Sequence, residues 1–347
     1  MNSKERVLAI FENGTVDRPP CWCGASPEFW EKIKRELNID DEQLLLRLGD
    51  DFRRVFAEYI GPVVPLKYKN ATYRSVFGVE RDGLGYGQPL HHPLAEATLQ
   101  DIIDYPWPDP EWMDVSKVKE EAQKYDCQYA ILGGDWSSFW HDAIDLLGME
   151  NLLIKMYTKP ELVDLLLEKI TTYYLAVNQQ IFEAAGDEID IFFIGNDFGG
   201  QTGPLMGPEM FEQFISPHLA QFTELGHNYG LKVQMHCCGG VYELIPLMIE
   251  AGLDALHALQ PDCNGMDLSR LKSEFGNKLI LNGGIDSKNI LIDGSVDYVK
   301  EQTRKVLDIM TPGGGYIAGA SHDTILEETP VENVLAMFDT IMKYQIT

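Results

Sequence analysis

The chain has 347 residues and a formal net charge of -26 at pH 7, from 54 acidic and 28 basic side chains. So acidic a surface repels phosphate backbones and anionic headgroups, which argues against nucleic acid or a membrane as a partner. No run approaches the ~18 apolar residues of a membrane span, and charged residues interrupt the N-terminal stretch where a signal peptide is apolar. A cytoplasmic protein is therefore expected. Its six cysteines should be reduced, as metal ligands or as core residues.

Short β-rich runs alternate with long amphipathic ones along the chain, most clearly after residue 125. This alternation is typical of repeated βα units around a parallel sheet. Eight runs are predicted strands: 20–24, 52–59, 129–134, 190–195, 232–236, 254–258, 278–283 and 315–320. They predict an α/β fold, a single (β/α)₈ TIM barrel spanning residues 1–347. Residues 61–125, rich in Pro, Gly and Trp, are expected to form an irregular insertion between the second and third units.

Polar and aromatic side chains follow most of the predicted strands. In a (β/α)₈ barrel the reacting groups lie at the carboxyl ends of the strands, because the βα loops all open on that face. The residues at these ends are Cys23, Asp135, Trp136, Asn196, Asp197, His236, Cys238, His257, Gln260, Asn282, Asp286 and Ser321–Asp323. A functional site is expected among them.

The string HCCGG begins at His236, at the end of the fifth predicted strand. Residues two apart on an extended segment point the same way, so His236 and Cys238 could share one metal ion while Cys237 faces the surrounding helices. His322 and His257 end other strands and could complete a site with the open position of a catalytic zinc. The alternative interpretation is that half-buried thiols and a hydrogen-bonded histidine only fill the barrel rim.

Three further strand-end residues each have two interpretations. Asp197 precedes a Gly-rich loop, where it could cap a turn or orient a substrate, and Asp286 could likewise cap the next turn or contact a ligand. Trp136 is expected to line a pocket, whereas Phe139 and Trp140 fit the core better. The sequence lacks the G-x-G-x-x-G and G-x-x-x-x-G-K-[ST] strings of nucleotide-binding loops.

Several strings, in this order over nearly the whole chain, resemble the uroporphyrinogen decarboxylase superfamily. They are VDRPPCW (16–22), YPWPDP (105–110), GNDFGGQTGPLMGPEMFEQFI (195–215), VQMHCCGG (233–240), NGGID (282–286) and PGGGYIAGASHD (312–323). The resemblance implies a (β/α)₈ fold. It also implies one of two activities: decarboxylation of uroporphyrinogen, or zinc-dependent methyl transfer in a cobalamin system.

The decarboxylase branch carries an arginine-rich segment after P-P-x-W that holds the substrate's carboxylates. Here residues 21–30 read CWCGASPEFW and contain no arginine, although Asp51 resembles that branch's pyrrole-binding aspartate. A porphyrinogen with eight carboxylates would be repelled by a chain of charge -26. The decarboxylase activity is therefore not expected.

The methyltransferase branch has H-x-C after the fifth strand and a further cysteine after the eighth as zinc ligands. His236 and Cys238 match the first pair, and His322 lies near the place of the second cysteine. The resemblance thus implies zinc bound by His236, Cys238 and His322, with His257 as the nearest further neighbour. Zinc with one thiolate stays cationic, which suits an oxygen that leaves as the methyl group departs.

The resulting expectation is a methyltransferase that moves a methyl group from a small, O-methylated donor to Co(I) of a separate corrinoid (cobalamin) protein. The catalytic candidates are Asp197 and Asp286, and the substrate-binding candidates are Trp136, Phe198, Gln201, Asp51 and His257. Three alternatives stay open: methyl transfer from the corrinoid to a thiol (coenzyme M-type) or folate, a metal-free decarboxylase, and a non-enzymatic binding barrel with its thiols in the core.

Overall fold

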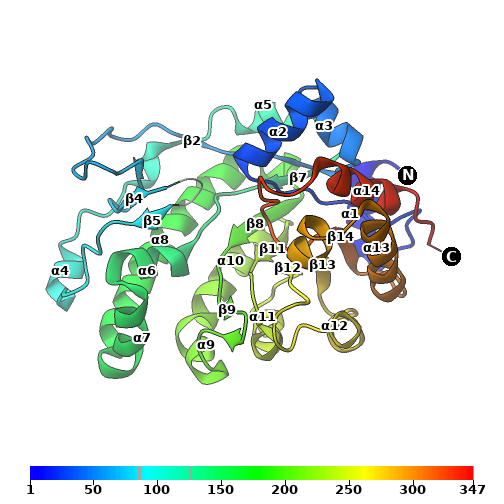
Figure 1. The fold of residues 1–347 in the computed structure, drawn as a ribbon. Coiled ribbons are helices and arrows are strands. Elements are labelled where there is room, and N and C mark those ends of the chain that lie inside the picture. Colours follow the sequence, from blue (N-terminus) through cyan, green and yellow to red (C-terminus); the bar gives the residue numbers. More distant parts are fainter. Residues whose placement is uncertain (84–86, 126, 347) are drawn as a thin grey trace.

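A seven-stranded parallel sheet forms the centre of the computed structural model, which describes residues 1–83, 87–125 and 127–346 (Figure 1). Its strands are β1 (Phe52–Arg54), β7 (Ala130–Gly133), β8 (Ile191–Gly195), β11 (Lys232–His236), β12 (Ala255–Leu259), β13 (Ile280–Ile285) and β14 (Tyr316–Ala320). They lie side by side in chain order and every neighbouring pair is parallel. This is the order that successive βα units produce.

An eighth segment closes the sheet into a barrel. Cys21 forms a parallel bridge with Ala318 of β14, and the Trp22 N–H donates to the Ala318 carbonyl at 2.9 Å. On the other side, the Asp51 N–H donates to the Cys21 carbonyl at 3.1 Å, just before β1 begins. The predicted strand at 20–24 is therefore reduced to a bridge, but it completes the predicted (β/α)₈ barrel.

Helices cover the outside of the barrel (Figure 1). The longest, α8 (Pro160–Ala185), begins with a proline at its first position and buries residues at three- and four-residue spacing, such as Leu162, Leu166 and Ile170. The other outer helices after β7 are α6 (Phe139–Leu147), α7 (Met149–Thr158), α9 (Pro208–Phe214), α10 (Ser216–Asn228), α11 (Ile245–Glu250), α12 (Leu268–Phe275), the π-helix η4 (Ser287–Ile292), α13 (Val296–Met310) and α14 (Val331–Met342).

Helix α1 (Ser3–Phe11) lies at the amino end of the barrel. Its Val7 and Ile10 pack into the same buried cluster as Phe52, Ala130 and the other inward-facing side chains of the strands. Helices α2 (Pro27–Leu37) and α3 (Asp41–Leu48) then connect the closing segment to β1. The side chains of α1 therefore fill the amino end of the barrel interior.

The insertion is more regular than predicted. The predicted strand 52–59 leaves the barrel after Arg54, and β2 (Glu58–Tyr59) pairs antiparallel with β6 (Met113–Asp114). A second small antiparallel sheet contains β3 (Tyr73–Arg74), β4 (Glu80–Asp82) and β5 (Gln88–Pro89). The insertion also contains three short helices: α4 (Leu99–Ile103), the 3₁₀ helix η1 (Pro110–Trp112) and α5 (Val118–Gln123). Strands of two or three residues are too short for periodicity to reveal.

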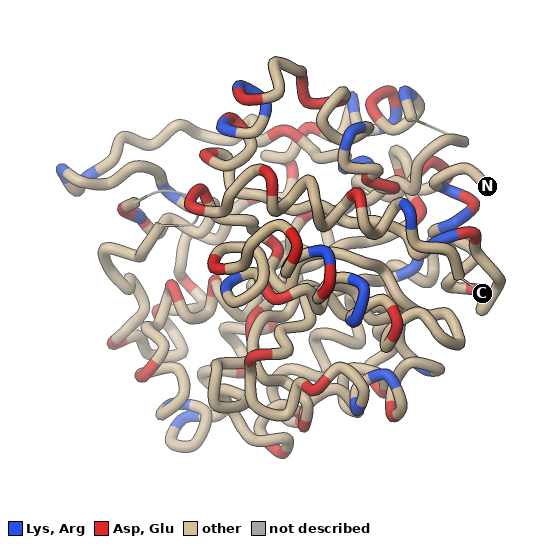
Figure 2. The backbone as a smooth tube through the Cα atoms, turned by 45° about the vertical axis from the view of Figure 1, so that its right-hand side comes forward, with Lys and Arg blue, Asp and Glu red and all other residues tan. Residues whose placement is uncertain are grey.

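The acidic residues are distributed along most of the backbone (Figure 2). In the parts of the chain that the structure describes, none of the helices combines the length and the apolar character needed to cross a bilayer.

Candidate metal centre and cavity

The ends of β8 and β11 bring Asp197 and Cys238 together. In the barrel register, His236 of β11 lies between Gly195 of β8 and His257 of β12. The two following loops then pack backbone against backbone. A Cβ on Gly199 would lie only 2.6 Å from the Cys238 carbonyl oxygen, so this approach requires glycine.

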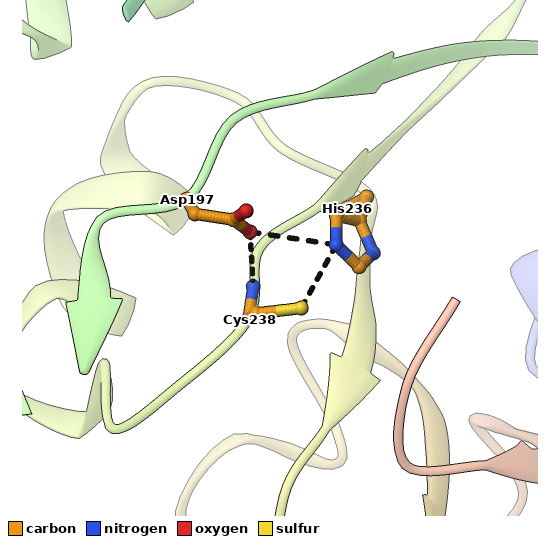
Figure 3. Close-up of side chains that lie close together, drawn as sticks. All are labelled: Asp197, His236 and Cys238. Atoms are coloured by element: carbon orange, nitrogen blue, oxygen red, sulfur yellow. Dashed lines mark hydrogen bonds and ion pairs between the residues drawn. The ribbon is translucent and has the colours of Figure 1, made fainter. Parts of the chain in front are cut away.

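His236, Cys238 and Asp197 form a compact group at the mouth (Figure 3). The Nε2 atom of His236 lies 3.0 Å from the Cys238 sulfur and 3.4 Å from Asp197 Oδ1, which also accepts the Cys238 N–H at 2.7 Å. The three ligand atoms lie within 4.8 Å of one another. One nitrogen, one sulfur and one oxygen in this arrangement fit zinc, which takes all three donor types and leaves room for a substrate ligand.

The electrostatics favour the anionic forms of the two acidic donors. Burial alone would raise the pKa of Asp197, but hydrogen bonds from His141 and His236 hold that pKa well below its usual value. Burial would likewise raise the pKa of the Cys238 thiol, yet the neighbouring His236 and a hydrogen bond from His322 lower it. Both shifts favour the deprotonated forms, which are the forms that bind a cation.

His257 supports His236 from inside the barrel. Its Nδ1 lies 3.2 Å from Nδ1 of His236 and 3.9 Å from Asp323 Oδ1. Burial is the main cause that lowers the pKa of His257 well below its usual value, and the charge of the nearby His236 lowers it further. The His257 ring is therefore neutral. A neutral His257 can accept the Nδ1–H of His236, which directs Nε2 of His236 toward Cys238 and Asp197, where a metal would replace its proton. His257, His236 and Asp323 form a second group with metal-ligand spacing.

His322 lies beside the Cys238 sulfur, but both of its ring nitrogens already take part in hydrogen bonds. Its Nδ1 accepts the Thr324 N–H at 3.0 Å, and a hydrogen bond to Cys238 raises its pKa. A ring that accepts at Nδ1 carries its proton on Nε2, so His322 donates to the sulfur in this arrangement. Among the described residues it belongs to neither group with metal-ligand spacing. Direct ligation by His322 stays a prediction.

A cavity of about 410 Å³ opens beside the group. Its wall includes Trp136, whose ring centroid lies 5.7 Å from that of His236 and 5.0 Å from that of Phe193. The other lining residues are Tyr73, Ser75, Val76, Arg81, Gly87, Gln88, Ser138, His141, Asp142, Asp145, Tyr174, Asp197, His236, Cys238, His322, Asp323 and Thr324. The strand ends, α6, α8 and the inserted β3–β4–β5 sheet all contribute to it.

Residues 115–344 match the family described as Uroporphyrinogen decarboxylase (URO-D). The chain belongs to the URO-D family. Its relatives include methylcobamide:CoM methyltransferases, MtaA of Methanosarcina barkeri (25% identical; 56% of this chain, 53% of the relative) and MtbA of Methanosarcina acetivorans (23%; 66% and 62%). A uroporphyrinogen decarboxylase of Pelobacter propionicus is 24% identical (54% and 51%). These alignments span about half to three fifths of each relative.

A solved methyltransferase from Methanosarcina mazei shares the fold, with a TM-score of 0.68 and 20% identity over 99% of both chains. The URO-D family assignment and the (β/α)₈ barrel predicted from sequence are therefore confirmed. The relatives carry both activities of the superfamily, methyl transfer and decarboxylation.

Not every predicted site residue of this URO-D family member reaches the cavity. Asp286 caps η4, where Oδ1 accepts the N–H groups of Lys288 and Asn289. Phe198 is fully buried and packs edge-on against Phe211, and Gln201 is exposed in the turn between β9 (Gly199–Gly200) and β10 (Gly203–Pro204). None of the three is a lining residue. His257 also lies beneath the wall, against His236.

Asp51 lies at the opposite end of the barrel, before β1 begins, and is not a lining residue of the cavity, so its role in substrate binding stays a prediction that the structure does not favour. Its fully buried carboxylate receives Arg6 and Arg18, each at 2.7 Å, and the Cys21 N–H at 2.7 Å. It therefore fixes the amino end of the barrel.

Several cavity residues are not predicted from the sequence: Tyr73, Arg81, Ser138, His141, Asp142, Asp145 and Tyr174. The lining residues between 138 and 145 could have been predicted to face the cavity, because they follow the end of strand β7. Tyr174, in the middle of α8, and the insertion residues could not have been.

Proposed function

We propose that this protein is a zinc-dependent methyltransferase that takes a methyl group from a small O-methylated compound and delivers it to Co(I) of a separate corrinoid protein. Family membership and the methylcobamide:CoM methyltransferases among the relatives support methyl transfer. The group of His236, Cys238 and Asp197 beside the cavity supports the metal.

One observation carries the choice of an oxygen leaving group: Cys238 is the one cysteine among the described lining residues. Cys237 points into the core, where its sulfur accepts the Phe198 N–H at 3.4 Å. His322 donates to the Cys238 sulfur and so reduces the electron density that this thiolate can give. One thiolate with nitrogen and oxygen donors leaves a metal more electron-poor than two thiolates would.

The chain's own residues have distinct roles in this proposal. Zinc held by His236, Cys238 and Asp197 or His322 would polarise the methylated oxygen, and the partner's corrinoid would accept the methyl group. Trp136 provides an apolar wall beside His236. When the C–O bond breaks, its electron pair stays on oxygen, which then needs a proton. His141 lines the cavity, with Nε2 3.2 Å from Asp197 Oδ2, and is placed to supply that proton.

The test is to mix zinc-loaded protein with cob(I)alamin and O-methyl donors and to follow methylcobalamin by absorbance. We expect transfer from at least one O-methyl donor, reduced roughly 10- to 100-fold in His322→Ala, because residues that contact metal ligands contribute about that much. The proposal is wrong if the protein only demethylates methylcobalamin toward a thiol and His322→Cys accelerates that reaction.

A second expected result is that uroporphyrinogen is not decarboxylated. Arg18 is paired with Asp51, and Arg53 with Glu42 at 2.6 Å. Arg54 lies over the Trp22 ring and 3.7 Å from Asp323, and the one arginine among the described lining residues, Arg81, is paired with Asp145. No free arginine cluster therefore faces the cavity from the described residues to hold the substrate's carboxylates. An anaerobic assay should yield no coproporphyrinogen, and enzyme-like turnover would contradict the assignment.

A further inference from the structure

A second polar group lies in the cavity wall, on the side formed by α6 and α8. Asp142 belongs to the first turn of α6, Ser138 immediately precedes that helix, and Tyr174 projects from α8. All three line the same cavity as His236 and Cys238. A ligand whose heteroatom reaches the metal group therefore meets a second recognition element in the same cavity.

Two hydrogen bonds fix the orientation of the Asp142 carboxylate, and both are accepted by the same oxygen, Oδ2. Its side chain is more than nine-tenths buried, and Oδ2 accepts the Tyr174 hydroxyl at 2.6 Å and the Ser138 hydroxyl at 3.1 Å. No hydrogen bond or ion pair from the described part of the chain reaches Oδ1. Burial raises the pKa of Asp142 to about 6, although the hydroxyls of Tyr174 and Ser138 counteract the rise. At neutral pH the group is a buried carboxylate with an unused acceptor.

The charges around this oxygen disfavour an anion. Four carboxylates line the cavity, from Asp142, Asp145, Asp197 and Asp323, while Arg81 is the single arginine or lysine among the described lining residues. Arg81 is ion-paired with Asp145 and donates to the Gly87 carbonyl at 3.0 Å. Asp197 lies beside His141 and His236, and Asp323 lies 3.7 Å from Arg54. Of the four carboxylates, Asp142 is thus the one without an ion-pair partner among the described residues, and its unused oxygen can accept a hydrogen bond from a ligand.

We propose that Asp142, oriented by Tyr174 and Ser138, determines substrate specificity by binding a hydroxyl or ammonium group of the ligand, and that the cavity rejects ligands with a carboxylate or sulfonate there. This inference rests on the proposed function for the identity of the ligand as a methylated small molecule. It goes further because it selects a chemical class: neutral or cationic donors with a hydrogen-bond-donating group. The same charges disfavour binding of an anionic thiol, which would be the methyl acceptor in the alternative direction of transfer.

The test uses three probes with the same methoxyphenyl group: 3-methoxybenzyl alcohol, 3-methoxybenzylamine and 3-methoxybenzoate. Their dissociation constants are measured by calorimetry on the full chain at pH 7.5, without corrinoid. We expect the alcohol and the amine to bind roughly 10- to 100-fold more tightly than the benzoate, the usual worth of a hydrogen bond to a charged group. Asp142→Asn should remove most of this preference, by weakening the amine and strengthening the benzoate.

Two further variants separate recognition from folding. Tyr174→Phe leaves the carboxylate but removes one of the bonds that orient it, so we expect a smaller loss of preference. Asp142→Glu should keep a preference for the amine over the benzoate. An unchanged ranking in folded Asp142→Asn would overturn the inference, as would tighter binding of the benzoate or failure of all three probes to bind wild type. If the probes bind as predicted but no methyl group is transferred, the proposed function is contradicted and the inference about Asp142 is not.

Discussion

His236→Ala is expected to lower bound zinc from about one ion per chain to a small fraction of that. His236 is the residue common to both groups with metal-ligand spacing, and its Nε2 lies within 3.4 Å of both Cys238 and Asp197 donor atoms. Removing the imidazole leaves two ligands, fewer than the three that catalytic zinc sites use. Methyl transfer should fall with the metal. Elemental analysis of purified, zinc-saturated and desalted protein measures the effect.

The matched control is the adjacent thiol. Cys238→Ser should lose most of the zinc, whereas Cys237→Ala should keep it, because the Cys237 sulfur points into the core. Equal zinc in wild type and His236→Ala would rule out the proposed site. Equal losses in the two cysteine variants would indicate that general unfolding, rather than lost coordination, releases the metal.

Asp51→Asn should lower the free energy of unfolding by about 3–5 kcal/mol, the usual cost of removing one partner from a buried ion pair. The substitution leaves the guanidinium groups of Arg6 and Arg18 near the amino end without their shared carboxylate. Arg6 keeps its pair with Asp17, but Arg18 loses both of its bonds to Asp51. Urea denaturation followed by circular dichroism measures the change.

The control for this effect is an exposed pair. Arg47 and Asp339 are more than one-third exposed and lie 2.7 Å apart, so Asp339→Asn should cost no more than about 1 kcal/mol. Similar losses in both variants would show that burial at Asp51 does not set the cost. A ligand-binding defect in Asp51→Asn without loss of stability would instead support the substrate-binding role that the sequence predicts for this residue.

The barrel could be predicted because its strands are apolar runs separated by long amphipathic helices. The insertion could not, since its paired segments are two or three residues long and lack a detectable period. Chain continuity also misled the prediction after β1: FRRVFAEY reads as one strand, but Arg54 ends it and Glu58 begins pairing elsewhere.

The metal group was predictable in part. Period-two alternation correctly placed His236 and Cys238 side by side, because an extended chain fixes where alternate side chains point. Asp197 was predicted to orient a substrate and not to join the metal group. Its contact with Cys238 arises where two glycine loops meet, and sequence spacing does not encode that meeting. The Asp142–Tyr174 bond joins residues 32 positions apart on two helices, and no local pattern announces it.

A zinc centre with a single thiolate is the feature on which the proposed function depends most. X-ray absorption at the zinc edge of the loaded wild-type protein measures this directly. We expect one sulfur neighbour at about 2.3 Å and the remaining nitrogen or oxygen neighbours at about 2.0–2.1 Å. The sulfur shell should disappear in any zinc that Cys238→Ser retains. Two sulfur neighbours per zinc, or none, would contradict the proposed ligand set and the preference for an oxygen leaving group that follows from it.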